Sequence, residues 1–183
     1  MRLARTLALA ASAAALLVAG AAHAALPVGA TAPEFSAQGA LAGKTFSFDL
    51  QKALARGPVV LYFFPAAFTS GCTKEAHDFA EASAQFTQAG ATLVGITAGN
   101  VDRVADFSKV ECRDKFAVLA DPGAKIAKTY KATNPLTDMK GWSDRTSYVI
   151  GQDGKIKLAY SNLNPDKHVD ETLAEVKALK TGA

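Results

Sequence analysis

The order of two apolar runs, with a helical stretch between them, constrains the fold of this chain most strongly. Residues 59–64 and 91–97 are rich in β-branched and aromatic residues, and such bounded runs predict strands buried within a sheet. Over residues 72–88 the apolar side chains recur at the spacing of an amphipathic helix, and Gly90 follows where such a helix would end. A strand, a helix and a second strand in this order predict a parallel unit with a right-handed crossover.

The strands and helices predicted in the rest of the sequence extend this unit into one α/β domain. Alternating residues over 43–48 predict an N-terminal strand, and residues 146–150 and 156–160 predict a hairpin around a five-residue loop. Residues 101–109 and 167–180 predict two further amphipathic helices. We therefore expect a mixed central sheet flanked by helices on both faces.

The first 24 residues predict a secretory signal peptide. Arg2 and Arg5 form a short basic start, residues 7–20 form an apolar core, and Ala22-His23-Ala24 matches a cleavage site. A retained membrane anchor is the alternative, but the apolar core is shorter than the ~20 residues that span a bilayer. We expect cleavage after Ala24, export to the periplasm and no membrane attachment afterwards.

The mature part, residues 25–183, has the length of one domain with a full core and contains no linker-like stretch. The whole chain has 20 basic and 17 acidic residues, and two of the basic ones lie in the predicted signal peptide. This near balance of charge gives no support for a nucleic-acid partner. Export would place both cysteines, Cys72 and Cys112, in an oxidising compartment, where a disulfide is the default expectation. The sequence leaves open whether that bond is permanent or cycles.

Cys72 lies where the predicted strand over residues 59–64 gives way to the predicted helix. Pro65 is expected to end the strand, Ser70-Gly71 marks a turn, and Cys72 falls in or beside the first helical turn. Unpaired N–H groups and the positive end of the helix dipole lie there, and both favour a thiolate over a thiol. The position therefore indicates a reactive cysteine. The alternatives are a small buried apolar residue or one half of a structural disulfide.

The motif Pro65-x-x-x-Thr69-x-x-Cys72 resembles the active-site motif of the peroxiredoxins. The string over residues 71–76 is most similar to the bacterioferritin-comigratory-protein, or peroxiredoxin Q, branch. Four other segments resemble the family in the same order along the chain, at residues 28–35, 95–97, 119–122 and 144–150. The resemblance implies a thioredoxin-like fold and, in an exported form, a thiol peroxidase that needs no metal or bound cofactor.

The resemblance implies that Cys72 attacks a peroxide oxygen and becomes a sulfenic acid. Negative charge then moves from sulfur to the leaving oxygen, so donors fixed around both atoms stabilise the transition state. By resemblance these donors are the Thr69 hydroxyl, the Cys72 backbone N–H and the Arg145 guanidinium. The alternative for Arg145 is a surface ion pair with its neighbour Asp144, which is what most exposed arginines form.

Two further residues belong to the same motif region. Pro65 fixes the loop before Cys72 and can screen the thiolate from water. Glu75 lies one helical turn after Cys72, where it could orient Arg145. It is equally plausible as an acidic residue that complements the helix dipole.

The sequence leaves two ways in which the Cys72 sulfenic acid could be resolved. Many members of the branch have a resolving cysteine five positions later, but here that position is His77. Other members use a cysteine after the next helix, and Cys112 fits that arrangement. Its charged neighbours predict an exposed segment, in which Arg113 and Lys115 would make the thiol more acidic. The alternative is a one-cysteine peroxidase in which an external thiol resolves the sulfenic acid.

The expected partners are a peroxide substrate and a periplasmic thioredoxin-like reductant, and the branch implies a monomer or a weak homodimer. One competing function is an exported thiol–disulfide oxidoreductase, but Cys72 is not part of a C-x-x-C pair. Another is a binding domain held together by one structural disulfide. No metal site is expected, because His77 and His168 are isolated from other ligand types at metal-binding spacing.

Overall fold

The computed structural model describes residues 25–182, so the predicted signal peptide lies outside the described residues. The described part holds seven strands, which are β1 (Ser36–Leu41), β2 (Lys44–Asp49), β3 (Val59–Ala66), β4 (Thr92–Gly99), β5 (Ala117–Ala120), β6 (Thr146–Ile150) and β7 (Ile156–Ser161). Its α-helices are α1 (Leu50–Leu54), α2 (Ser70–Gln88), α3 (Val104–Val110), α4 (Lys125–Thr129), α5 (Pro135–Met139) and α6 (His168–Thr181). Short 3-10 turns precede α3 at Val101–Arg103 and α6 at Pro165–Lys167. Within residues 25–182, no helix is both long enough and apolar enough to cross a membrane.

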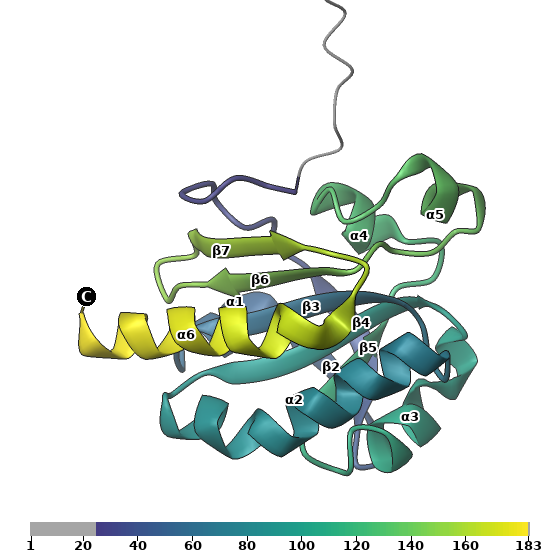
Figure 1. Cartoon of the computed structure of the whole chain (residues 1–183), viewed down its shortest axis with the longest axis horizontal. Helices are drawn as coiled ribbons and strands as arrows, with labels where there is room; N and C mark the ends of the chain where they lie inside the picture. The colour runs from purple at the N-terminus through teal and green to yellow at the C-terminus, as the bar shows by residue number, and fades with distance from the viewer. Residues whose placement is uncertain (1–24, 183) are drawn as a thin grey trace, which may run out of the picture.

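The strands form one mixed sheet in the order β2-β1-β5-β4-β3-β6-β7 (Figure 1). β3 and β4 pair in parallel around α2, as the sequence predicts, and β5 adds to β4 in parallel. β6 joins the other side of β3 in antiparallel register, and β7 returns beside β6 as the predicted hairpin. The carboxyl end of β3 and the amino end of α2 therefore meet at one edge of the sheet.

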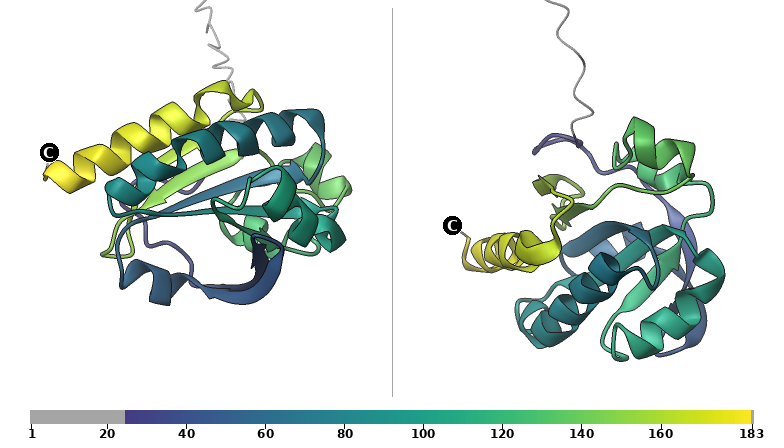
Figure 2. Two further views of the ribbon diagram at one scale, coloured as in Figure 1. Left: turned by 90° about the horizontal axis from the view of Figure 1, so that it is seen from below. Right: turned by 45° about the vertical axis from the view of Figure 1, so that its right-hand side comes forward.

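Helices cover both faces of the sheet, as expected (Figure 2). Side chains alternate along β3, so that Tyr62 and Phe64 face α2, α3 and α6, whereas Leu61 and Phe63 face α1 and α4. All four side chains are fully buried. This two-sided burial explains why β3 reads as a continuous apolar run in the sequence.

The prediction that Pro65 ends the strand after Phe64 is wrong by two residues, because β3 continues through Pro65 to Ala66. The β6 ladder stops at Phe63, so the missing N–H of Pro65 removes no bond to β6. On the other side the strand still pairs with β4, where Ala66 lies opposite Gly99.

β1 has no counterpart in the sequence-based prediction. Apart from Leu41 its residues are small or polar, and Gly39 weakens the strand signal further. The structure shows why a glycine stands there: a Cβ on Gly39 would lie 2.5 Å from the Leu119 side chain and from the Val118 carbonyl oxygen on β5. The close approach of β1 to β5 therefore depends on the missing side chain. The predicted helix over residues 101–109 is also divided into a 3-10 turn and α3.

Candidate active site

Cys72 is the third residue of α2, and only 1% of its surface is exposed. Its backbone N–H belongs to the first helical turn, where amides have no acceptor within the helix. The chain reaches this turn through Phe68, which adopts a φ of +63°. The Phe68 ring packs edge-on against Phe107, and the Arg103 guanidinium lies 3.8 Å from its centre. These contacts hold the turn that places the Cys72 sulfur at the end of β3.

Thr69 is the N-cap residue of α2, but its side chain does not cap the helix. Its hydroxyl instead donates to the Ala66 carbonyl oxygen at 3.0 Å. The Ala67 carbonyl oxygen accepts a hydrogen bond from the Asn100 side chain at 2.7 Å, which fastens the same loop to the end of β4. The Thr69 oxygen still has lone pairs, so it can accept a hydrogen bond from a bound ligand.

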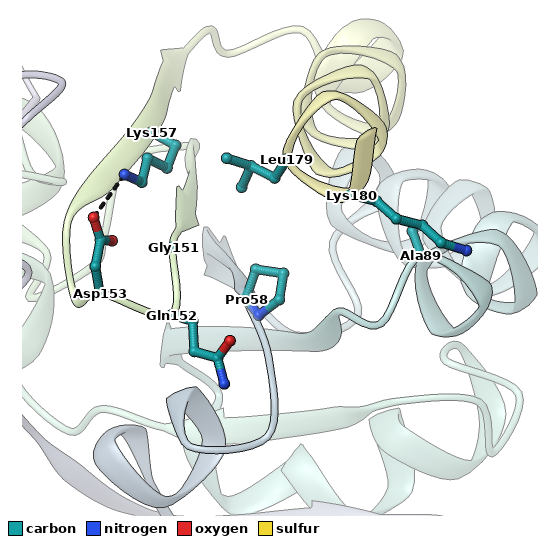
Figure 3. Close-up of a pocket in the computed structure, with 8 residues that line it drawn as sticks. All are labelled: Pro58, Ala89, Gly151, Gln152, Asp153, Lys157, Leu179 and Lys180. Carbon is teal, nitrogen blue, oxygen red and sulfur yellow. Dashed lines mark hydrogen bonds and ion pairs between the residues drawn. The ribbon is translucent and has the colours of Figure 1, made fainter. Parts of the chain in front are cut away.

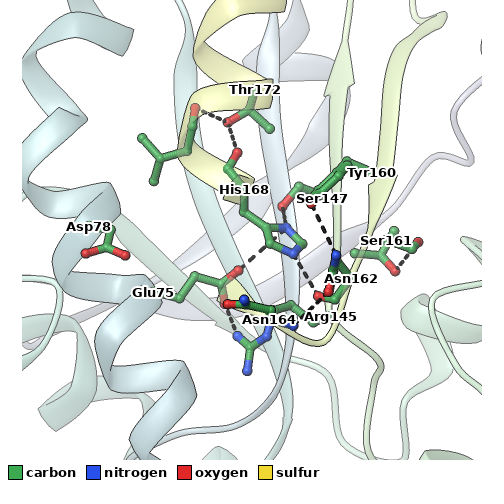
Figure 4. Close-up of polar contacts among 12 residues, drawn as sticks. Glu75, Asp78, Arg145, Ser147, Tyr160, Ser161, Asn162, Asn164, His168 and Thr172 are labelled. Carbon is green, nitrogen blue, oxygen red and sulfur yellow. Dashed lines mark hydrogen bonds and ion pairs between the residues drawn. The ribbon is translucent and has the colours of Figure 1, made fainter. Parts of the chain in front are cut away.

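Arg145 precedes β6 and is buried next to Cys72. Its Nη2 lies 3.5 Å from the Cys72 sulfur, and its Nε donates to the Leu163 carbonyl oxygen at 2.9 Å. The third nitrogen, Nη1, forms an ion pair with Glu75 Oε2 (Figure 4). The guanidinium therefore pairs with Glu75, while Asp144 accepts from the Arg145 backbone N–H and from the Asn134 side-chain amide.

Glu75 is fully buried on α2, one turn after Cys72. Burial favours the neutral form and raises the pKa of Glu75, whereas the charge and the hydrogen bond of Arg145 lower this pKa and favour the carboxylate. Its Oε1 has no hydrogen-bond partner and lies 3.7 Å from His168 Nδ1. The carboxyl group thus lies between the guanidinium and a buried imidazole.

His168 begins α6 and extends this network, which the sequence reasoning missed. Its Nε2 donates to the Asn162 carbonyl oxygen at 2.9 Å, and its Nδ1 lies 2.7 Å from the Ser147 hydroxyl (Figure 4). This pattern fits the neutral tautomer with a proton on Nε2. Burial lowers the pKa of His168 to about 4. One sequence signal could have indicated that His168 is buried. It lies at the start of a predicted amphipathic helix, whose apolar face must pack against the domain.

We predict that His168 makes the protein less stable as the pH falls. In the unfolded chain a histidine takes up a proton near pH ~6.5, whereas the folded chain resists protonation until the pH approaches the lowered pKa of His168, about 4. Between these values unfolding takes up a proton, so stability that is present above the unfolded pKa is lost as the pH drops. From pH ~7 to ~4, the wild-type free energy of unfolding should fall on the order of 3 kcal/mol more than that of His168→Gln. Denaturant titrations at several pH values measure this difference, and parallel pH profiles for the two proteins would contradict it.

Cys112 follows α3 and is fully buried, so the predicted exposed segment is wrong at this residue. Arg113 on one side of it is exposed, whereas Glu111 on the other side is partly buried, and the thiol turns inward to the apolar core that also contains Cys72. Burial raises the pKa of Cys112 well above its usual value, with the Glu111 charge adding to the effect. The expected acidification by Arg113 and Lys115 is therefore also wrong, and Arg113 pairs with Glu81 instead. Both cysteines are free thiols.

A cavity of about 240 Å³ lies away from these residues (Figure 3). It is bounded by the start of β3, the loop between β6 and β7, and the last turns of α6. None of the predicted site residues lines it. Among residues 25–182, no three His, Cys, Asp or Glu side chains gather where they could hold a metal ion.

The sequence and the structure are similar to those of several known proteins. The model of the AhpC/TSA family matches residues 28–159. The chain is 37% identical over 124 residues to a chloroplastic peroxiredoxin Q of Sedum lineare, and 38% identical over 139 residues to one of Populus jackii. These matches cover 67% and 75% of this chain but 65% and 62% of the plant proteins, so the chain spans just under two thirds of their length.

The structure is also similar to the crystal structure of peroxidoxin BcpB from Mycobacterium tuberculosis. The TM-score is 0.72 at 31% sequence identity, and the match covers 83% of this chain and 97% of that chain. A reduced 2-Cys peroxiredoxin from Plasmodium vivax shares the fold with a TM-score of 0.74 at 23% identity. The predicted α/β, thioredoxin-like fold is confirmed by these matches together with the mixed sheet.

Proposed function

The chain belongs to the AhpC/TSA family, and on that premise we propose that it is a thiol peroxidase that reduces hydrogen peroxide and organic hydroperoxides. The proposal rests above all on the Arg145 guanidinium, whose Nη2 lies 3.5 Å from the Cys72 sulfur at the start of α2. A fixed positive charge and free backbone N–H groups at one sulfur stabilise a thiolate. No metal or bound cofactor is needed for the reaction.

In the first step the Cys72 thiolate attacks one oxygen of the peroxide. The sulfur gives an electron pair to that oxygen, the O–O bond breaks, and the other oxygen leaves with its electrons as hydroxide or alkoxide. Protonation converts the leaving group to water or an alcohol, and Cys72 becomes a sulfenic acid. The sulfur has then been oxidised by two electrons and the peroxide reduced by two.

The surrounding groups favour the charge shift in this step. Arg145 can follow the negative charge from the sulfur towards the oxygens, because its planar guanidinium presents several donors. The Cys72 backbone N–H and the Thr69 hydroxyl are the other polar groups at this helix start. Glu75 and the Leu163 carbonyl oxygen hold Arg145 in place, and Pro65 fixes the loop and limits access of water. The site is therefore organised before the peroxide arrives.

In the second step the Cys112 thiol attacks the Cys72 sulfenic acid, a disulfide forms and water leaves. A disulfide requires Cα atoms within ~7 Å of each other. Because the two free thiols are buried on different elements, the start of α2 and the segment after α3 must open for this step. The alternative is resolution by an external thiol, with Cys112 as a bystander.

A reductant must then reopen the disulfide for sustained turnover. We propose that the protein acts in the periplasm after removal of residues 1–24, as a monomer or weak homodimer, and that a thioredoxin-like protein there is the electron donor. An exported thiol–disulfide oxidoreductase is less well supported, because Cys112 is buried and no second cysteine lies near Cys72 in the sequence.

The resolving step is tested by treating the reduced protein with one equivalent of hydrogen peroxide and digesting it with trypsin. We expect a linked peptide pair that contains Cys72 and Cys112, and a loss of both free thiols. Cys112→Ser should instead accumulate a sulfenic acid at Cys72, which a dione reagent traps. A trapped sulfenic acid in the wild-type protein, with no linked peptides, would contradict resolution by Cys112 and leave the one-cysteine mechanism.

A further inference from the structure

The segment that carries Cys112 is fastened to α2 on both sides of the cysteine. On one side, Glu111 Oε2 lies 2.7 Å from His77 Nε2. On the other side, Arg113 Nη1 lies 3.2 Å from Glu81 Oε1. His77 and Glu81 are one turn apart on α2, the helix that begins at the Cys72 site. We refer to the His77–Glu111 pair as the clasp.

The two ion pairs differ in how well they are shielded from water. The side chains of Glu111 and His77 are 14% and 34% exposed, whereas those of Arg113 and Glu81 are 47% and 70% exposed. Exposed pairs contribute little because solvent screens them. A short, partly buried hydrogen bond to a carboxylate contributes more, so the clasp is the stronger of the two attachments.

The closed segment also carries backbone strain. Arg113 and Asp114 are consecutive residues with φ values of +51° and +59°, a region that non-glycine residues rarely occupy. The conformation persists only if other contacts hold it. Those contacts include the burial of Cys112, the hydrogen bond from its N–H to the Phe107 carbonyl oxygen at 3.0 Å, the hydrogen bond from the Asp114 N–H to the Ser108 carbonyl oxygen at 3.2 Å, and the clasp. Breaking the clasp therefore favours opening.

We propose that His77 is a positioning residue for the resolving step: through Glu111 it holds Cys112 inside the core, and release of this clasp limits the rate of disulfide formation. The inference rests on the proposed role of Cys112. His77, five residues after Cys72, thus slows the release of the resolving thiol of Cys112, which lies on the segment after α3.

The clasp has a chemical consequence. While Cys112 is held closed, the Cys72 sulfenic acid survives longer and can meet a second peroxide. That peroxide oxidises it to a sulfinic acid and is itself reduced to water or an alcohol, so the enzyme is inactivated. A slower release of Cys112 therefore makes the protein more sensitive to excess peroxide.

The first test measures release of Cys112 without any peroxide chemistry. In the Cys72→Ser background, the rate at which a thiol reagent labels Cys112 reports the open fraction of the segment. Loss of a hydrogen bond to a charged group should raise this rate about tenfold in His77→Ala and in Glu111→Ala. His77→Gln, which keeps a donor towards Glu111, should remain within about threefold of the wild-type rate. Glu81→Gln, which removes only the exposed pair, is the matched control and should change the rate less than about twofold.

The second test follows the reaction of the otherwise wild-type protein with peroxide by rapid quenching and intact-mass measurement. His77→Ala should form the Cys72–Cys112 disulfide about tenfold faster and yield less sulfinic acid, while sulfenic acid formation keeps its rate. Faster labelling of Cys112 with an unchanged rate of disulfide formation would overturn the inference, as would unchanged labelling in a variant whose thermal unfolding shows that it is folded. A wild-type protein that forms no disulfide at all would overturn the role of Cys112 as well, which separates the two failures.

Discussion

Cys72→Ser is expected to lower the rate of peroxide reduction by on the order of a thousandfold or more, because the substitution removes the nucleophile itself. A serine hydroxyl is not ionised near neutral pH, and its oxygen cannot be oxidised to a stable equivalent of a sulfenic acid. The loss should therefore be in the chemical step. It is measured as peroxide consumed by the reduced protein with a general thiol as donor.

Cys112→Ser is the matched control for this result. It should consume its first equivalent of peroxide at the wild-type rate, because the Cys72 site is intact. Further turnover then depends on the external thiol. Peroxidase activity in Cys72→Ser would contradict the proposed mechanism, and loss of the first turnover in Cys112→Ser would show that Cys112 does more than resolve.

The second large effect is expected from Arg145→Met, which should slow sulfenic acid formation by about 10²–10³-fold. The guanidinium is the charged group at the Cys72 sulfur, and methionine keeps much of its length without the charge. Arg145→Lys should recover part of the rate, since an ammonium cannot reach Cys72, Glu75 and the Leu163 carbonyl oxygen together. Rapid mixing of reduced protein with peroxide measures this step.

A stability effect accompanies the loss of Arg145 and must be separated from it. Arg145→Met leaves Glu75 buried without its counter-ion, and breaking one side of a buried pair costs about 3–5 kcal/mol. The double variant Glu75→Gln/Arg145→Met removes both charges and should regain much of the free energy of unfolding, but not the rate. If the double variant also regains the rate, Arg145 acts only through the fold.

The sequence predicted the central part of the fold correctly because its signals are local. The continuous apolar run of β3 and the helical spacing of apolar residues in α2 are each formed by residues that are close neighbours in the chain. β1 was not predicted because its position depends on pairing with β5, a strand far along the chain. That pairing requires a residue without a side chain at Gly39. The strand propensity of residues 36–41 depends on those residues alone, so it gives no information about a pairing with β5.

The same distinction applies to the candidate site. Cys72 could be placed at a helix start from the residues around it, and the order of strand, turn and helix was sufficient. The contact between Glu75 and Arg145 joins residues 70 positions apart, and His168 comes from a third element. Only the packing of α6 against β6 and α2 brings these groups together.

The parallel unit and the position of Cys72 could be inferred from the residues alone, because each depends on residues close together in the chain, and the family resemblance rests on the order of short motifs along it. Packing of the elements was needed to show that the Arg145 guanidinium contacts both the Cys72 sulfur and the Glu75 carboxylate. It also decided that Cys112 is buried despite its charged neighbours. The physical reason is that burial and ion pairing depend on which distant side chains exclude water from a group, and that is set when the elements pack.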